Sequence, residues 1–161
     1  MADVLTHYSV LSRGIELKIV DWSEYAGLLK KLEEEVRASH FDGIVGIGRG
    51  GSIMAAYLAS KMGIPTFTPV FIRHVRSQSG DVKIEVHDLG QVKSLKGRLL
   101  VVDDSLVQGR AMNFVLDLIP KTARVKTLVM YVRSGAKFKP DFVGTEFDEK
   151  EQELMFFYDL P

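Results

Sequence analysis

The sequence contains no cysteine. Disulfide bonds, iron–sulfur clusters and zinc sites built on thiolates are therefore excluded. The chain also has no excess charge of either sign, because 21 Lys and Arg residues balance 21 Asp and Glu residues. This balance argues against a nucleic-acid coat or a polybasic membrane anchor, so no nucleic-acid partner is required.

Long hydrophobic runs are missing as well. No apolar segment approaches the length that spans a bilayer, and residues 1–14 have no positive segment followed by a long apolar core. We therefore expect a cytoplasmic protein that has no membrane partner. The chain has 161 residues, of which 46% are hydrophobic, and this is enough for a single domain with a real core.

Helical and strand-like patterns alternate along the chain. Apolar runs typical of buried strands are expected over residues 43–47, 66–72, 97–103 and 124–132. Helices are expected over residues 21–40, 52–62 and 111–119, and Asp21 with Glu24 suits a capping box at the first of them. This alternation predicts an α/β domain whose mostly parallel sheet carries helices on both faces. Residues 73–96 are expected to form a mobile loop or hairpin, and residues 139–161 a small C-terminal flap.

A glycine-rich turn is expected after the strand at residues 43–47. Residues 46–51 read GIGRGG, which formally matches GxGxxG. A dinucleotide site would also need an acidic residue about twenty positions further on, and residues 66–73 contain none. This argues against a dinucleotide-dependent oxidoreductase. A structural turn and a nucleotide site both remain open for the segment alone, but Arg49 favours a phosphate beside free backbone NH groups.

Asp103 and Asp104 follow the most apolar strand of the chain. Because burial of unpaired charge is costly, we expect these carboxylates to lie outside the core. They could cap the following helix, or they could bind the vicinal hydroxyls of a ribose, with or without Mg²⁺. Residues 107–110 then present backbone NH groups at the start of a helix, which suits a terminal phosphate.

Three segments in this order resemble the type I phosphoribosyltransferase family, and especially its hypoxanthine–guanine and xanthine–guanine members. Residues 99–104, followed by Gly109 and a helix, resemble the signature that binds phosphoribosyl pyrophosphate (PRPP). Residues 46–51, with a helix ending at residues 63–65, resemble the pyrophosphate loop. Residues 138–144 resemble a stretch of the purine enzymes. The resemblance implies the phosphoribosyltransferase fold, with PRPP and a nucleobase or nucleotide as small-molecule partners.

The resemblance also implies a role for each matched position. Asp103 and Asp104 would be the catalytic residues, binding the ribose hydroxyls and Mg²⁺. The other PRPP contacts would come from Arg49, Gly50 and Gly51 at the pyrophosphate, and from Val107, Gln108, Gly109, Arg110 and Ala111 at the 5′-phosphate. The base would meet Val132, Phe156 and Asp159, although core packing is the simpler role for Phe156. Residues 73–90 would close over the site and exclude water from the reacting sugar.

Three positions depart from the family pattern. Val107 and Gln108 stand where Asp and Thr are usual, and Ala111 stands where a hydroxyl residue is usual. Val107 removes the usual candidate for a general base near the purine. Two functions therefore stay open. One is transfer of the 5-phosphoribosyl group from PRPP to a nucleobase, expected to be a 6-oxopurine, with release of pyrophosphate. The other is PRPP or nucleotide binding by a regulator that has lost transfer activity. A homo-oligomer is compatible with both.

Overall fold

The computed structural model describes residues 16–76, 82–148, 150 and 152–159. The helices are α2 (Trp22–Val36), α3 (Gly48–Met62) and α4 (Arg110–Leu118), with short 3₁₀ turns η2 (Val92–Ser94) and η3 (Phe157–Asp159). The strands are β1 (Glu16–Val20), β2 (Gly43–Ile47), β3 (Thr66–Arg76), β4 (Val82–Asp88), β5 (Arg98–Leu106), β6 (Arg124–Arg133), β7 (Phe142–Phe147) and β8 (Gln152–Phe156).

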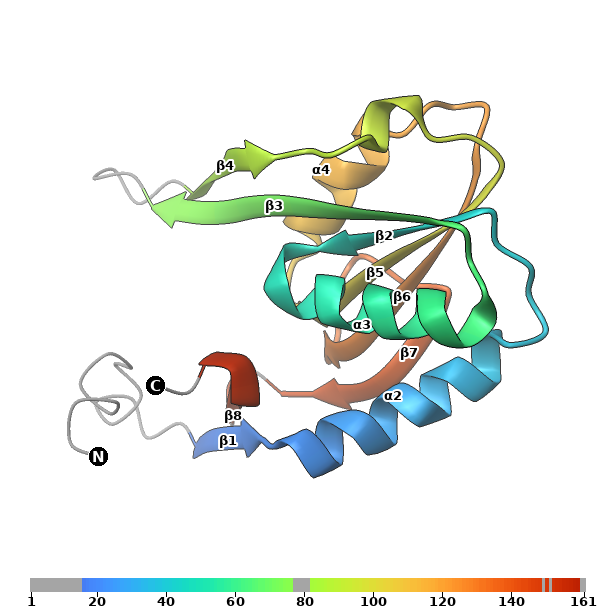
Figure 1. The fold of residues 1–161 in the computed structure, drawn as a ribbon. Helices are drawn as coiled ribbons and strands as arrows, with labels where there is room; N and C mark the ends of the chain where they lie inside the picture. Colours follow the sequence, from blue (N-terminus) through green and yellow to red (C-terminus); the bar gives the residue numbers. More distant parts are fainter. Residues whose placement is uncertain (1–15, 77–81, 149, 151, 160–161) are drawn as a thin grey trace.

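Six of the strands form one sheet in the order β4-β3-β2-β5-β6-β7. All neighbours pair in parallel except β3 and β4, which are antiparallel. Helices α2 and α3 cover one face of this sheet and α4 covers the other (Figure 1). The predicted α/β fold, a mostly parallel sheet with helices on both faces, is confirmed.

The alternation of side chains along each central strand builds two cores. In β5, Leu100 and Val102 pack toward α2 and α3, whereas Leu99 and Val101 pack toward α4. All four side chains are at most 1% exposed. A parallel strand buried on both faces needs apolar residues at every position, which explains the unbroken apolar run in the sequence.

Several element boundaries differ from the prediction. The capping bond is present, since the Glu24 NH donates to the Asp21 carboxylate at 2.8 Å, but α2 ends at Val36. The glycine-rich segment forms the first turn of α3 instead of a separate turn. Strand β5 continues through the two aspartates to Leu106, because parallel pairing with β6 extends to that residue.

The C-terminal segment is also organised differently from the expected flap at residues 139–161. Its first part, β7, pairs with β6 and is an edge strand of the main sheet. Its last part, β8, pairs in parallel with β1, with Glu16 opposite Gln152 and Val20 opposite Phe156. This small sheet brings the two ends of the described chain together beside α2 (Figure 1).

Residues 73–76 and 82–88 of the expected loop or hairpin lie in the antiparallel pair β3–β4, and residues 77–81 between them fall outside the described residues. Within the described part of the chain, no helix has the length and apolar character needed to cross a membrane.

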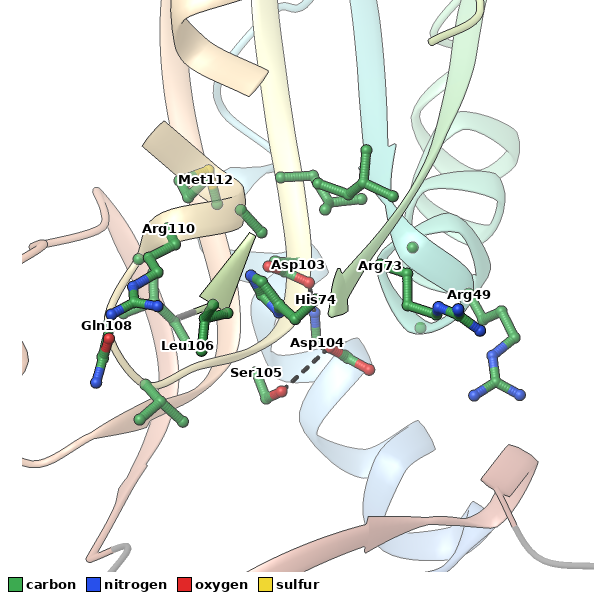
Figure 2. Close-up of a pocket in the computed structure, with 18 of the residues that line it drawn as sticks. Arg49, Arg73, His74, Asp103, Asp104, Ser105, Leu106, Gln108, Arg110 and Met112 are labelled. Carbon is green, nitrogen blue, oxygen red and sulfur yellow. Dashed lines mark hydrogen bonds between the residues drawn. The ribbon is translucent and has the colours of Figure 1, made fainter. Parts of the chain in front are cut away.

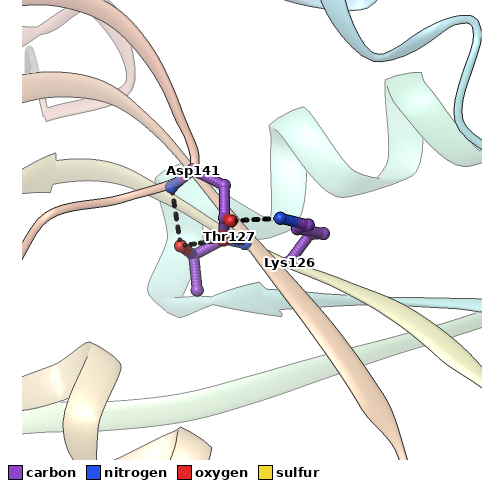
Figure 3. Close-up of polar contacts among 3 residues, drawn as sticks. All are labelled: Lys126, Thr127 and Asp141. Carbon is purple, nitrogen blue, oxygen red and sulfur yellow. Dashed lines mark hydrogen bonds and ion pairs between the residues drawn. The ribbon is translucent and has the colours of Figure 1, made fainter.

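A polar cluster around Asp141 fastens the start of β7 to β6 (Figure 3). The Asp141 carboxylate accepts bonds from the Thr127 NH at 2.8 Å, from the Thr127 hydroxyl at 3.0 Å and from the Lys126 ammonium at 2.6 Å. Burial tends to raise the pKa of Asp141, but these three donors outweigh it and lower the pKa below its usual value.

Asp141→Asn is expected to lower the free energy of unfolding by about 1 kcal/mol at neutral pH, because it weakens charge-assisted bonds at a partly exposed site. A lowered carboxyl pKa stabilises the fold above the unfolded pKa of about 3.9, and this contribution is lost as the pH falls through the folded value. The deficit measured by urea unfolding should therefore shrink in acid. Asp117→Asn, at a side chain 82% exposed, should match the wild type. Equal stability of Asp141→Asn and wild type would contradict this role.

Candidate functional site

A cavity of about 780 Å³ opens where the carboxyl ends of β2 and β5 meet the starts of α3 and α4. In parallel sheets this edge is where ligands bind, because the loops after neighbouring strands converge there. Its wall is completed by β3 and β4 of the hairpin and by η3. The predicted residues that line it are Arg49, Gly50, Asp103, Asp104, Val107, Gln108, Gly109, Arg110, Ala111 and Asp159.

Charges are arranged in a definite order across this cavity. In Figure 2, Asp103 and Asp104 lie in the middle, with Arg49 and Arg73 on one side and Arg110 on the other. A molecule with two anionic ends and hydroxyl groups between them would match this order, because the cations suit anions and the carboxylates accept from hydroxyls.

Asp103 is buried and Asp104 is partly buried, contrary to the prediction that the pair lies outside the core. Asp103 is only 8% exposed, because β5 continues past it as a central strand. Its carboxylate accepts from the Asp104 NH at 3.0 Å. The Asp104 carboxylate accepts from the Ser105 hydroxyl at 3.3 Å and from the Tyr158 hydroxyl.

Burial raises the pKa of both carboxyl groups, and for Asp103 the neighbouring Asp104 charge raises it further. Among the described residues, no Lys or Arg lies within 4.0 Å of either carboxylate. Buried acids without a cationic partner are costly to the fold, which is typical of a site that completes its charge balance with a ligand. Capping of α4 does not explain them, since the N-cap of α4 is Gly109.

The segment between β5 and α4 forms the second part of the cavity wall. Residues 107–109 lead into α4, whose first residue is Arg110. The NH groups of a first helical turn have no partners within the helix, so they can bind an anion. His74 on β3 and Arg110 at the start of α4 line the same cavity (Figure 2). Burial lowers the pKa of His74, and the positive charge of Arg110 lowers it further.

The first turn of α3 forms the third part. Arg49 is paired with Asp159 at 2.7 Å, although its side chain is 71% exposed. Gly51 is buried and does not line the cavity. A Cβ atom at Gly51 would lie 2.5 Å from the Val102 carbonyl oxygen, so this glycine lets α3 pack closely on β5. The structure therefore gives Gly51 a packing role instead of the predicted ligand contact.

Two of the three predicted base contacts are not at the cavity. Val132 is 4% exposed and packs in the core beneath α4, and Phe156 is 4% exposed and packs in the core beneath α2 and α3. Core packing was the simpler role for Phe156, and the structure agrees with it. Asp159 is the predicted base contact that does line the cavity.

Tyr158 lines the cavity although sequence reasoning did not select it. It bonds to a residue 54 positions away, and it reaches that residue because β8 pairs with β1. No local pattern marks this tyrosine, since its position depends on the pairing of the two ends of the chain.

The acidic pair also fits a divalent cation held together with a ligand. Mg²⁺ is usually bound by one or two carboxylates plus substrate phosphates and water. Asp103 and Asp104 supply oxygen donors of this kind, and the buried, unbalanced charge favours a cation there. Among the described residues, no group of three His, Asp or Glu side chains could hold a metal alone.

Several phosphoribosyltransferases are similar to this chain in sequence or in fold. A xanthine-guanine phosphoribosyltransferase of Idiomarina loihiensis is 27% identical over 129 residues, which cover 78% of this chain and 77% of the relative. The crystal structure of a purine phosphoribosyltransferase from Pyrococcus horikoshii has a TM-score of 0.73 at 20% identity, covering 90% of this chain and 95% of that one. The xanthine-guanine-hypoxanthine phosphoribosyltransferase of Helicobacter pylori has a TM-score of 0.69 at 18% identity, with the same coverage.

The sequence model of the phosphoribosyl transferase domain family matches residues 18–156 of this chain. This range includes every strand of the main sheet and both loops of the cavity. The type I phosphoribosyltransferase resemblance drawn from the motifs is thereby confirmed, and the chain belongs to the phosphoribosyl transferase domain family.

Proposed function

We propose that this protein transfers the 5-phosphoribosyl group of PRPP to a purine base, a 6-oxopurine, and releases pyrophosphate, which is a reaction of purine salvage. The observation that carries the proposal is the acidic pair of buried Asp103 and partly buried Asp104, which lies between two cationic parts of one cavity. Family membership and the named relatives support a transfer enzyme over a regulator that only binds PRPP.

PRPP matches the order of charges in the cavity. Its ribose hydroxyls would donate to Asp103 and Asp104, which already accept bonds from backbone and hydroxyl donors. Its pyrophosphate would meet Arg49 and the first turn of α3, and its 5′-phosphate would meet residues 107–111 with Arg110. The protein would hold the sugar in place and stabilise the negative charge that develops on the leaving pyrophosphate.

Mg²⁺ belongs to this proposal, with Asp103 and Asp104 as the residues that would hold it. When bound, it would neutralise charge on the acidic pair and on PRPP oxygens. The residues of the chain then have to orient the sugar and keep water out of the cavity.

Proton transfer is the step for which this chain lacks the usual side chain. Val107 lines the cavity and is 36% exposed, and it offers no carboxylate to a purine. As the bond between the ribose carbon and pyrophosphate breaks and a bond to the base nitrogen forms, the nitrogen must lose its proton. We infer that this proton passes to water, or that the base reacts as its anion.

The test is a turnover assay with PRPP, Mg²⁺ and separate samples of xanthine, guanine, hypoxanthine and adenine, with products identified by mass. We expect nucleotides from the 6-oxopurines, and none from the Asp103→Asn/Asp104→Asn variant. Failure to form any nucleotide while PRPP still binds in a calorimetric titration would support the regulator instead.

The cytoplasmic location, the possible homo-oligomer and the absence of a nucleic-acid or membrane partner stay predictions. So does closure of residues 73–90 over the site, since residues 77–81 of that segment lie outside the described residues.

A further inference from the structure

The 3₁₀ turn η3 makes two polar contacts with the residues that the proposed function assigns to PRPP. The Tyr158 hydroxyl donates a hydrogen bond to the Asp104 carboxylate. The adjacent Asp159 carboxylate forms an ion pair with the Arg49 guanidinium at 2.7 Å. Both contacts lie inside the cavity wall, since all four residues line it.

Each contact has the chemistry of the PRPP group expected at the same place. A tyrosine hydroxyl donates to a carboxylate as a ribose hydroxyl does, and a carboxylate pairs with arginine as a phosphate does. We propose that Tyr158 and Asp159 act as an internal substitute for PRPP, which occupies the sugar and pyrophosphate positions until PRPP displaces η3. The inference rests on the proposed function and adds a regulatory contact to the same site.

In the two states, Tyr158 and a ribose hydroxyl compete for one oxygen of Asp104. One oxygen of Asp104 accepts from Ser105 and the other accepts from Tyr158. Gly50 of α3 lies beside the bond between Tyr158 and Asp104, since a Cβ atom at Gly50 would overlap both the Asp104 carboxylate and the Tyr158 hydroxyl. The first turn of α3 is therefore packed directly against this bond, and a ribose hydroxyl that approaches the same oxygen must compete with Tyr158 for it.

Aromatic packing holds η3 in position and also provides a signal for its displacement. Phe157 meets Trp22 edge to face, with ring centres 5.2 Å apart. Tyr158 stacks on Phe156 at 5.3 Å with the rings 4° from parallel. Trp22 is the only tryptophan of the chain and is 58% exposed. Because Trp22 contacts Phe157 of η3, a displacement of η3 should change the tryptophan fluorescence.

The two contacts can be removed separately and tested with ligands that carry one group each. Ribose 5-phosphate carries the hydroxyls without the pyrophosphate, and pyrophosphate carries the anion without the sugar. With Mg²⁺ and no base present, Tyr158→Phe should bind ribose 5-phosphate about tenfold more tightly and pyrophosphate as the wild type does. Asp159→Asn should bind pyrophosphate about threefold more tightly, because an exposed ion pair is weaker, and ribose 5-phosphate as the wild type does.

The matched control is Tyr57→Phe, which removes a tyrosine hydroxyl that bonds to Glu33 away from the cavity. This variant should bind ribose 5-phosphate, pyrophosphate and PRPP as tightly as the wild type does. Calorimetric titration gives the affinities, and saturating PRPP should change the Trp22 emission of the wild type. Unchanged or weaker binding of ribose 5-phosphate by Tyr158→Phe would overturn the inference, as would unaltered Trp22 emission. If the wild type binds PRPP and the Tyr158 and Asp159 variants bind their ligands no more tightly than the wild type, the internal substitute is refuted and the proposed function stands. If neither the wild type nor any variant binds PRPP, both the internal substitute and the proposed function are refuted.

Discussion

Replacement of both Asp103 and Asp104 by asparagine should abolish Mg²⁺-dependent PRPP binding and at the same time make the fold more stable. The loss of binding, about a hundredfold or more, follows because asparagine keeps the size but loses the charge that holds the hydroxyls and the cation. The gain in stability, about 1 kcal/mol, follows because the buried charge of Asp103 and the partly buried charge of Asp104, neither of which has a cationic partner, disappear.

The pH dependence of stability separates this explanation from a general effect of mutation. A raised carboxyl pKa gives stability that is fully present below the unfolded value of about 3.9 and is lost as the pH rises through the folded value. The variant should therefore exceed the wild type most at neutral pH, and the difference should vanish in acid. Urea unfolding at several pH values measures this, with Asp117→Asn as the surface control. A variant less stable than the wild type at neutral pH would refute the explanation by burial. Retained PRPP binding would refute the assignment of Asp103 and Asp104 to the sugar hydroxyls.

Two glycine-to-alanine substitutions should change stability in opposite directions. At Gly51, a methyl carbon would lie 2.5 Å from the Val102 carbonyl oxygen and 3.2 Å from the Asp103 Cα, so α3 must move away from β5. Overpacking of this kind costs more than the helix propensity of alanine returns, and we expect a net loss of roughly 2 kcal/mol. PRPP binding should weaken as well, because the displaced helix α3 carries Arg49 and Gly50 at the cavity.

Gly27 is the matched control, because it lies inside α2 and a Cβ atom there meets nothing within 4 Å. Gly27→Ala should raise the free energy of unfolding by about 1 kcal/mol, the usual difference between the two residues in a helix. Thermal and urea unfolding measure both variants. If Gly51→Ala proved as stable as Gly27→Ala, close packing of α3 on β5 would not be the reason for glycine at that position.

The sequence alone determined the features that depend on local order. Buried parallel strands need apolar residues at every position, so the runs at residues 43–47 and 99–102 identified the central strands. Both loops follow such strands, and the carboxyl ends of parallel strands share one edge of a sheet, so their meeting was predictable. The proposed roles of Asp103 and Asp104 rest on the same reasoning and on the family resemblance, and the domain match confirms the family.

Only the tertiary structure decided the burial and the long-range contacts. Asp103 is buried because β5 pairs with β6 beyond it, and an apolar pattern that stops at Val102 gives no sign of this. Phe156 on β8 and Val132 on β6 lie in the two cores because their strands direct these side chains into the cores and away from the cavity. Tyr158 reaches Asp104 because β8 pairs with β1, and pairing between the ends of a chain leaves no periodic signal in either segment.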